Sequence, residues 1–595
     1  SATPATQSEA AFEIVEADLV DETVPVGGRI DVTVTVANTG DVAGTTQVIL
    51  QFDGEEVTTD SIDISAGDQK TVTLTASRDQ SGPVAVTVNG HAVGELTVEP
   101  QTVFHVAPDG DDGDRGLEAE PLATIAAALD RAEPGETIKL SPGEYREEVW
   151  TVRDGEPDAP ITLTGPPEAV IRPPPGASDC LRIEHSHVHV SGMTIDGLIE
   201  PDRKHTDYEA WVDRCVFITP AGRYEEGVEY IRDVVLEPAR MGNCARAMVQ
   251  INRLRDAVIG NFRVIGPAGM QFDERVDNFD HGHVREIVYI GTAEVDRGGS
   301  GYYPYETLDR SRNIRIHHID NSAGYRHNEL VDVKLGSSNV TVEYCTTRNA
   351  GHNTESEVNA ALDLKGNDCT VRWNDIGDSP LPFSFGAWAP SDDVDGADWS
   401  RNNEIYGNHV HGFAAGVFRL KNEGDVGPVS LDDQGRICGN RIERGSPKLD
   451  RWVGDANGVD GDAGDRRGEQ EVTVTVGAGP DERRLDPPAV VVDRGTKVVW
   501  EWTGDDEHYI VRQERVENDP GSVPDPLSAS YSESKPHESV GFYRYACYAH
   551  HDEGMRGSVI VREEESRYDF ARQTCPDDVP DGDGVGHAGG DSPWA

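Results

Sequence analysis

Residues 339–342 read Asn-Val-Thr-Val, and this pattern, a turn-forming residue followed by an alternating strand, recurs along the middle of the chain. Residues 313–316 read Asn-Ile-Arg-Ile and residues 368–371 read Asp-Cys-Thr-Val, while residues 403–405 and 435–438 are looser copies. The starts at 313, 339, 368 and 403 differ by 26, 29 and 35 residues. Strand-sized repeats that stack on their neighbours are typical of solenoids. The sequence therefore predicts a coil of stacked strands joined by loops of variable length.

The segment before these repeats contains a helix-like run and then short strands. An apolar, helix-like run at 121–129 is followed by Pro-Gly turns and short strands at 134–145. This succession resembles the amino-terminal cap and first coil of a right-handed parallel β-helix, the pectate-lyase-like fold. A helix at this place covers strand edges that would otherwise be unpaired. We place the β-helix at 101–455.

Short alternating strands with Gly and Asn turns precede the β-helix. Apolar Ile30, Val32, Val34 and Val36 alternate with polar residues, which predicts an antiparallel sandwich over residues 12–100. The segment from Ile30 to Gly44 resembles the cell-adhesion-related, immunoglobulin-like sandwich modules of microbial surface proteins. Because it has no cluster of catalytic side chains, we interpret it as a spacer or docking module after a flexible lead-in at 1–11.

A short stretch near the carboxyl end carries metal-ligand chemistry. Residues 542–555 contain Cys547, His550 three residues later and Met555 five residues beyond that, and an upstream strand leads to His508. Two imidazoles and a thiolate with a weak axial thioether are the ligand set of a type 1 blue-copper site. The alternatives are a metal-free sandwich with a buried cysteine, or a zinc site.

Residues 469–563 resemble a cupredoxin of the halocyanin and plastocyanin kind, through residues 495–504, His508 and the spacing of Cys547, His550, Met555 and Gly557. The resemblance implies a β-sandwich that carries single electrons, with His508, Cys547, His550 and Met555 as copper ligands. Tyr509 and Ala549 stand where the family usually has Asn and Pro. We expect these two departures to alter the rigidity of the ligand loop and the redox potential.

Composition restricts the class of protein. The 595 residues contain 108 Asp and Glu against 53 Lys and Arg, a net charge of −55, and only nine of the cations are Lys. Such a surface is suited to strong brine, where salt screens the repulsion between carboxylates. It argues against a nucleic-acid partner, because no basic stripe is present. No apolar run reaches the roughly 20 residues of a membrane-spanning helix. We expect a halophilic, secreted or cell-surface protein.

The charge leads to a first prediction. Lowering the salt concentration lengthens electrostatic screening from roughly 3 Å at 1 M to 30 Å at 0.01 M, so repulsion between carboxylates grows. We expect the thermal unfolding midpoint to fall on desalting, which calorimetry in molar and millimolar NaCl would measure. Equal midpoints in the two solutions would contradict the interpretation of the surface as salt-adapted.

The segments around the copper domain carry two further expectations. Residues 456–468 are rich in Asp and Gly, and their spacing is similar to a calcium loop without its bidentate Glu, so a hydrated acidic linker is preferred to a calcium site. Cys438 lies in the last recognisable repeat and Cys575 in the tail at 564–595. A Cys438–Cys575 bond would return the tail to the β-helix and stabilise the fold by roughly 4–5 kcal/mol.

Three lysines occupy roughly corresponding places in different repeats and are candidates for catalysis. Lys334, Lys365 and Lys421 each end a short strand, and residues 328–334 resemble the strand that carries the catalytic Lys of some pectate lyases. A row of such lysines could bind an acidic polysaccharide, and one with a lowered pKa could abstract a proton beside a carboxylate. The alternative is an exposed ladder of paired Asp and Lys. His327 and His352 are further candidates.

The favoured interpretation is an extracellular electron-transfer protein that the sandwich and the β-helix position on a surface or glycan, with a redox protein as partner. The first alternative is a polysaccharide lyase or hydrolase with an appended redox domain. The second is a structural subunit that self-assembles into a surface layer or filament and binds copper.

Overall fold

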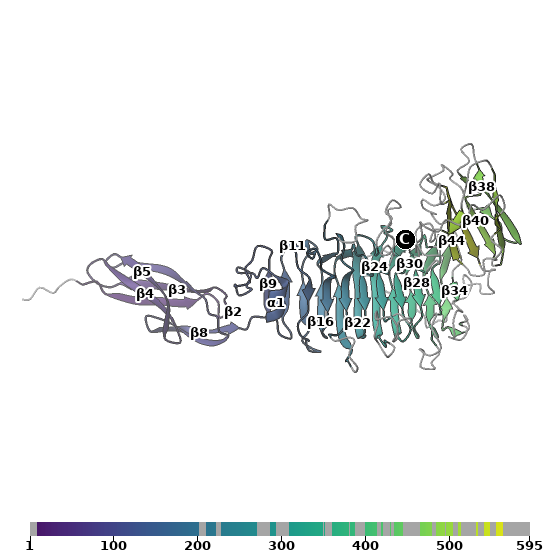
Figure 1. Cartoon of the computed structure of the whole chain (residues 1–595). Helices are drawn as coiled ribbons and strands as arrows, with labels where there is room; N and C mark the ends of the chain where they lie inside the picture. The colour runs from purple at the N-terminus through teal and green to yellow at the C-terminus, as the bar shows by residue number, and fades with distance from the viewer. Residues whose placement is uncertain are drawn as a thin grey trace, which may run out of the picture. The chain divides into compact units, whose positions relative to one another are not determined.

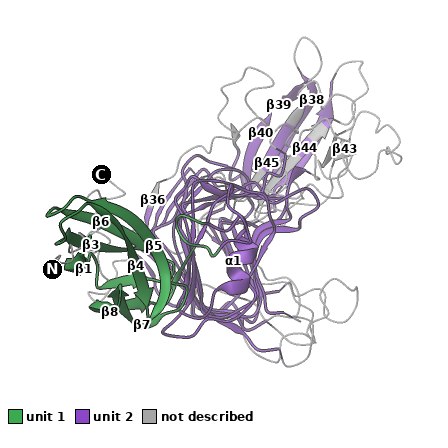
Figure 2. Ribbon diagram, turned by 90° about the vertical axis from the view of Figure 1, so that its left-hand side faces the viewer, with its two compact units in different colours: residues 1–104, 115–120 green, residues 105–114, 121–595 purple. Residues whose placement is uncertain are grey.

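The computed structural model describes residues 9–200, 210–221, 228–269, 286–292, 309–325, 327–348, 350, 360–379, 381–386, 399–412, 418–420, 429, 433–443, 464–478, 484–493, 495–503, 510–512, 531–532, 541–547 and 555–562. Figure 2 colours the two compact units of the chain, residues 1–104 with 115–120 and residues 105–114 with 121–595. The described residues are almost entirely β-strand, as predicted; their one α-helix is α1 (Ile125–Arg131).

The first unit is the predicted β-sandwich. The hydrophobic residues of its third strand are buried and the polar ones between them are not, so alternation in the sequence becomes an inner and an outer face. Antiparallel pairing sets Val34 of this strand opposite Val72. One sheet has the order β1-β3-β6 and the other β2-β8-β7-β4-β5. The strands are β1 (Phe12–Leu19), β2 (Thr23–Pro25), β3 (Ile30–Asn38), β4 (Gly44–Phe52), β5 (Glu55–Ile64), β6 (Gln69–Ala76), β7 (Gly82–Val88) and β8 (His91–Glu99).

The second unit contains the predicted parallel β-helix, whose strands stack along one axis (Figure 1). One of its faces is a nine-stranded sheet, called here the nine-stranded face. Its strands, in order, are β12 (Val149–Trp150), β15 (Asp179–Ile183), β18 (Arg214–Ile218), β21 (Val249–Ile251), β23 (Val288–Ile290), β25 (Val331–Val333), β28 (Leu362–Leu364), β31 (Phe383–Phe385) and β34 (Phe418–Leu420).

The other strands of the β-helix form two further parallel rows, which β22 and β24 join because each is long enough to belong to both. They are β9 (Val103–Val106), β10 (Thr137–Leu140), β11 (Gly143–Tyr145), β13 (Ile161–Thr164), β14 (Ala169–Ile171), β16 (Val188–Ser191), β17 (Thr194–Asp196), β19 (Ile231–Glu237), β20 (Arg240–Gly242), β22 (Leu254–Val264), β24 (Arg312–Asn321), β26 (Ser338–Glu343), β27 (Thr346–Arg348), β29 (Thr370–Arg372), β30 (Asp375–Gly377), β32 (Glu404–Tyr406), β33 (His409–His411), β35 (Ile437–Cys438) and β36 (Arg441–Glu443).

Helix α1 lies at the amino-terminal end of the coil (Figure 1), as predicted, but it begins later than the apolar run. Thr124 is its N-cap and accepts a hydrogen bond from the backbone N–H of Ala127 at 3.1 Å. The carboxylate of Glu147 accepts from the first two helical N–H groups at 2.7 and 3.0 Å. These bonds satisfy donors that the helix itself cannot.

A ladder of Asn and Asp marks where turns in the middle of the coil begin. Asn313 donates to Asp256 at 2.7 Å, Asn339 donates to Asn313 at 2.8 Å and Asn402 donates to Asp368 at 2.7 Å. All five have φ between 52° and 58°, a conformation that Asn and Asp adopt more readily than most residues. The start predicted at residue 403 is therefore wrong by one residue, because Asn402 and not Asn403 continues the ladder.

A second column of asparagines lies inside the coil and bonds to the backbone. Asn408 accepts through Oδ1 from the backbone N–H of Asn374 at 3.0 Å, and the carbonyl of Val371 accepts from its amide at 2.9 Å. Asn440 accepts from the N–H of Asn408 in the same way. Buried backbone groups at the turns are thus paired without water.

The carboxyl-terminal part is a second sandwich, with sheet orders β37-β40-β45-β44-β42 and β39-β38-β41-β43. Its core contains Val474, Trp500 and Tyr545. Strand β37 lies within the segment predicted as an acidic linker and pairs with β40. The strands are β37 (Gly464–Asp465), β38 (Glu471–Ala478), β39 (Arg484–Asp486), β40 (Ala489–Asp493), β41 (Lys497–Trp502), β42 (Ile510–Arg512), β43 (Tyr531–Ser532), β44 (Gly541–Cys547) and β45 (Arg556–Arg562).

The cysteines of the β-helix differ in their bonding state. Cys345 and Cys369 are free thiols, and the backbone N–H of Cys345 donates to Asn374, so the two sulfurs belong to offset positions. Cys438 is disulfide-bonded, whereas its predicted partner Cys575 lies outside the described residues.

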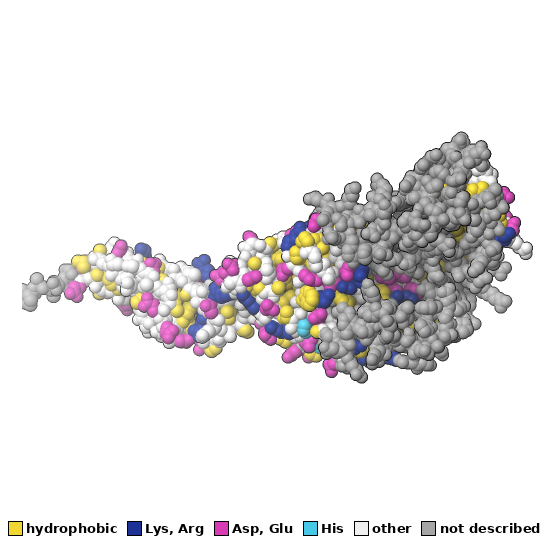
Figure 3. Space-filling model, in the orientation of Figure 1, with side chains coloured by type: hydrophobic (Ala, Val, Ile, Leu, Met, Phe, Trp, Pro, Cys, Tyr) yellow, Lys and Arg dark blue, Asp and Glu magenta, His cyan; other side chains and the backbone are white. Residues whose placement is uncertain are grey.

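The surface agrees with the acidic composition. Acidic side chains are scattered over the described surface and interspersed with Arg and Lys (Figure 3). The described part of the chain has no helix with the length and apolar character needed to cross a membrane.

Candidate functional sites

The centre of the nine-stranded face carries a buried group of charges around Asp332. Val331 and Val333 point into the coil, so Asp332 between them points outward, yet it is only 1% exposed. Its carboxylate contacts both predicted lysines, Lys334 Nζ at 2.6 Å and Lys365 Nζ at 2.7 Å. The two lysines are therefore brought together, and Lys421 lies outside the described residues.

The predicted ladder of Asp and Lys exists, but it is buried and not exposed. Lys365 also contacts Asp363 at 3.0 Å, and Asp363 lies beside Asp332 in the parallel register. Asp363 is 1% and Lys365 7% exposed. An exposed ladder would contribute little to stability, whereas removal of one member of a buried pair leaves an uncompensated charge. The next strand places Ser384 in this row, and Arg419 follows on the turn after it, so the three aligned positions share one row as predicted.

Two glutamates that the sequence did not identify complete the cluster. The backbone N–H of Ile287 donates to the carbonyl of Glu329, so Glu286 and Glu329 occupy adjacent turns of the coil. One oxygen from each of Glu286, Glu329 and Asp332 lies within 4.8 Å of the others, and all three residues are buried. We call Glu286, Glu329 and Asp332 the carboxylate cluster.

The carboxylates of the cluster repel one another. Burial, and then the neighbouring carboxylates beginning with Glu286, raise the pKa of Glu329 well above the usual value of a glutamate. Its Oε2 atom is buried without a hydrogen-bond partner. Oxygens on opposite sides of a calcium ion stand roughly 5 Å apart, since each Ca–O distance is about 2.3–2.6 Å. The cluster therefore fits a hard cation that takes oxygen ligands.

Lys334 packs against residues of the preceding turn. Its Nζ lies 4.7 Å from the centre of the Tyr289 ring. A Cβ on Gly291 would lie 3.0 Å from Cβ of Lys334, and Gly291 has φ +96°, so a side chain there would both collide and be strained.

The glutamate pKa gives a second prediction. An ordinary carboxylate ionises near pH 4.5, whereas folded Glu329 keeps its proton to higher pH. The stability that the folded protein gains from binding this proton is therefore fully present below pH 4.5. It is lost as the pH rises towards the raised pKa of Glu329 in the folded state. Without divalent cations, we expect Glu329→Gln to have the higher unfolding midpoint at pH 8 and to lose this advantage near pH 4.5.

Thermal unfolding in chelator across this pH range tests the prediction, with exposed Glu168→Gln as control. Calcium should raise the wild-type midpoint and leave Glu329→Gln nearly unchanged. Parallel pH curves for wild type and Glu329→Gln would contradict the raised pKa of Glu329.

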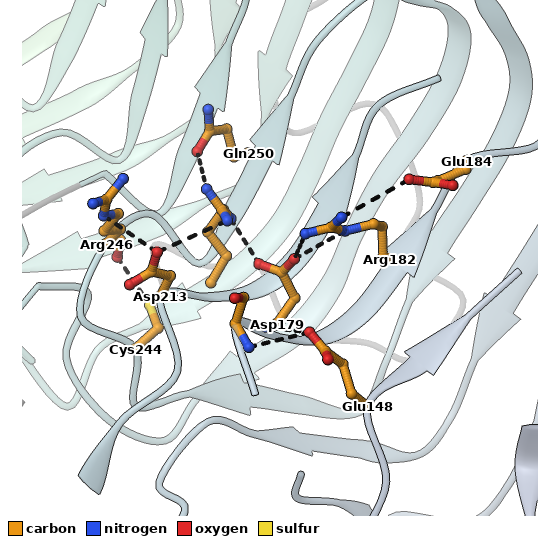
Figure 4. A network of polar contacts seen from close by, with 10 residues as sticks. Glu148, Asp179, Arg182, Glu184, Asp213, Cys244, Arg246 and Gln250 are labelled. Carbon is orange, nitrogen blue, oxygen red and sulfur yellow. Dashed lines mark hydrogen bonds and ion pairs between the residues drawn. The ribbon is translucent and has the colours of Figure 1, made fainter. Parts of the chain in front are cut away.

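Towards the amino end of the same face, Asp179 organises a polar network (Figure 4). It is fully buried and accepts from Arg182 at 2.5 Å and from Arg214 at 2.7 Å. The Arg182 guanidinium lies over the ring of Trp150 at 4.3 Å, and that of Arg214 lies over Phe217 at 4.3 Å. In register order, the outward row of this face runs from Trp150, Arg182 and Phe217 through Gln250 and Tyr289 to Asp332.

Among the described residues, the candidate histidine His327 does not belong to the carboxylate cluster. His327 is buried and its Nε2 contacts Thr347 at 2.9 Å, and burial lowers its pKa to about 4. His317, whose pKa burial also lowers to about 4, contacts Glu237 at 3.1 Å, and His318 stacks on Tyr344. His352 lies outside the described residues.

In the carboxyl-terminal sandwich, the two sulfur ligands of the predicted copper site are buried together. Cys547 ends β44 and Met555 directly precedes β45, and neither is exposed. The backbone N–H of Cys547 donates to the carbonyl of Met555 at 2.9 Å, which closes the ends of the ligand loop. Strand β42 pairs with β44 so that Ile510 lies opposite Cys547. His508 and His550 lie outside the described residues, so their roles stay predictions.

Known proteins resemble three different parts of the chain. Residues 11–96 match the CARDB family. A segment of 108 residues, 18% of the chain, is 39% identical to a halocyanin from Natronomonas pharaonis and covers 66% of that protein, just under two thirds of its length. An alginate lyase from Paenibacillus sp. str. FPU-7 is similar over 54% of this chain and 95% of its own, with 17% identity and a TM-score of 0.38. Pectate lyase Pel9A is similar over 56% and 78%, with 12% identity and a TM-score of 0.35. The chain thus joins a CARDB-like module, a parallel β-helix and a halocyanin-like segment.

Proposed function

We propose that the carboxyl-terminal sandwich is a cupredoxin that transfers single electrons through a type 1 copper site. The observation that carries this proposal is the 39% identity to a halocyanin, together with the buried pair Cys547 and Met555. His508, Cys547, His550 and Met555 would hold the copper, which supplies reversible one-electron chemistry. The chain's own contribution is to bury both sulfurs and fix the ligand loop, so that the ligands need little movement when the charge of the site changes.

The test is a pair of spectra of the copper-loaded full chain. Visible absorption and electron spin resonance before and after reduction should show an intense band and a copper(II) signal that disappear together. A colourless copper(II) protein would contradict the proposal.

We propose, as a second candidate, that the β-helix cleaves an anionic polysaccharide by β-elimination. The observation that favours it is the contact of Lys334 with the carboxylate cluster. Several buried titratable side chains lie close together there, as they often do at functional sites. A cation such as calcium bound there would neutralise the carboxylate of a uronate and make its α-proton more acidic.

The side chains then have separate roles. Asp332 holds the amine of Lys334, and neutral Lys334 would take the α-proton of the uronate. The released electron pair forms a carbon–carbon double bond as the glycosidic bond breaks, and the leaving oxygen takes up a proton. The negative charge of Asp332 stabilises the ammonium form of Lys334. A cation bound at the cluster would offset that charge and so favour the neutral amine.

Incubation of the full chain with alginate or polygalacturonate, in calcium or in chelator, tests this candidate. We expect an unsaturated uronate product that absorbs in the ultraviolet and forms only with calcium. Reducing ends without that absorption would indicate a hydrolase and contradict the elimination mechanism.

We further propose that the protein works outside the cell in strong salt and receives electrons from a redox protein. The charge of −55 supports a brine environment, and the CARDB match supports a module that positions the other domains on a surface or glycan. Self-assembly into a layer or filament is the alternative, and light scattering of the purified chain would detect it.

A further inference from the structure

A group of one carboxylate and two imidazoles lies on the row formed by β27, β30 and β33, not on the nine-stranded face. In β30 and β33 the central residues Ile376 and Val410 are fully buried in the coil. The flanking residues Asp375, His409 and His411 therefore point outward. Parallel register sets Asp375 opposite His409, so these groups come from adjacent turns of the coil.

The three side chains meet at one oxygen. Oδ1 of Asp375 lies 2.9 Å from Nε2 of His411 and 3.3 Å from Nδ1 of His409. One ligand atom from each residue lies within 4.8 Å of the other two. The side chains are 16–27% exposed, so the group lies within reach of solvent and is still held by its surroundings.

Gly377 creates the space that this arrangement needs. It lies opposite His411 in the register, and a Cβ at this position would be 2.4 Å from Cε1 and 2.7 Å from Nε2 of the His411 ring. Any larger residue would displace the imidazole. The ring of His411 can therefore lie across β30 and reach Asp375, which stands two residues before the glycine.

Arg348 fixes the carboxylate through its other oxygen. Its Nη2 atom pairs with Oδ2 of Asp375, and its Nη1 atom donates to the backbone carbonyls of Thr347 at 2.8 Å and Asp375 at 3.0 Å. Oδ1 is thus left to face the two histidines. An outer partner that orients a carboxylate in this way is a usual feature of metal sites.

The donor types select the kind of ion. Calcium and magnesium prefer oxygen ligands, whereas two imidazole nitrogens and one carboxylate oxygen suit zinc, copper(II) and nickel. We propose that Asp375, His409 and His411 bind one divalent late transition-metal ion, for which zinc is the probe. Three protein ligands leave at least one position for water or another ligand, as in open zinc sites.

The test must separate this site from the other two metal-binding candidates. We would use the full chain with Cys547→Ser and His550→Ala, which removes two predicted copper ligands, and add excess calcium to occupy the carboxylate cluster. Isothermal titration with zinc should then show one tight equivalent. His411→Gln in this background should lose that equivalent, and Arg348→Lys should weaken binding about tenfold, the low end of effects from outer-shell partners.

His189→Gln is the matched control. His189 also lies on an outward-facing strand position near a carboxylate, with its Nε2 atom 3.9 Å from Asp233, but it belongs to neither group of three ligand atoms among the described residues. This variant should keep the zinc equivalent. Unchanged zinc binding in His411→Gln, or an equal loss in His189→Gln, would overturn the proposal.

A second measurement needs no substitution at the proposed site itself. Copper(II) added at one equivalent to the same background protein should give a spin-resonance spectrum with coupling to imidazole nitrogens. Zinc should displace that copper signal at higher concentration. A spectrum with oxygen ligands alone would overturn the proposed site.

Discussion

Replacing Cys547 with Ser is expected to abolish the intense visible band of the copper-loaded protein. The band arises from charge transfer between a thiolate sulfur and copper(II), and a serine hydroxyl does not supply that donor. Because Cys547 is fully buried beside Met555, the substitution is small and should leave the sandwich folded. Absorption and spin resonance at equal copper loading would measure the loss, which we expect to be complete.

Two further variants show whether the effect belongs to the ligand. Met555→Leu should keep the colour and raise the potential, because the axial thioether tunes the site without creating it. Cys369→Ser, at a buried free thiol of the β-helix, should leave the spectrum unchanged. If the band persists in Cys547→Ser, the copper assignment is wrong.

The second large effect is expected at Lys334. Lys334→Arg keeps a positive charge beside Asp332, but a guanidinium does not lose its proton and cannot act as a base. If the β-helix is a lyase, the initial rate of unsaturated product formation in calcium should fall by roughly 10²- to 10⁴-fold, the usual range for loss of a general base. Initial ultraviolet rates on a uronate polymer would measure it.

Lys139→Arg is the control, since Lys139 is an exposed lysine on another strand of the same coil. Calcium-dependent thermal stability should survive in both variants and would show that the fold and the carboxylate cluster remain. A Lys334→Arg protein as fast as the wild type would exclude Lys334 as the base.

The coil could be predicted because its signal is local. Turns in the middle of the coil begin with Asn or Asp in the left-handed conformation, and a few alternating residues follow, so Asn313, Asn339 and Asp368 were recognisable one by one. Residues 402 and 403 are both Asn, and the pattern could not decide between them. The hydrogen bond from Asn402 to Asp368 decides it.

The carboxylate cluster could not be predicted in the same way. Glu286 and Glu329 stand 43 positions apart in the sequence, and only the stacking of β23 on β25 brings them together. The burial of Asp332 could not be predicted from the sequence either. Alternation shows that Asp332 points away from the coil interior, but it does not show what covers that face. The ligand spacing around Cys547 was readable because one short loop carries three of the four predicted ligands.

The disulfide at Cys438 has a consequence for how the β-helix opens. Each turn of a stacked coil is stabilised only by its nearest neighbours, so such a coil melts by fraying inward from its ends. Helix α1 protects the first turn, whereas Cys438 lies in β35, which pairs with β32 in the last turn of the coil that the structure describes. A covalent link there anchors the turn that would otherwise peel away first. Amide hydrogens of β35 and β36 should therefore exchange slowly in the oxidised protein and much faster after reduction, with little change at the amino-terminal turns.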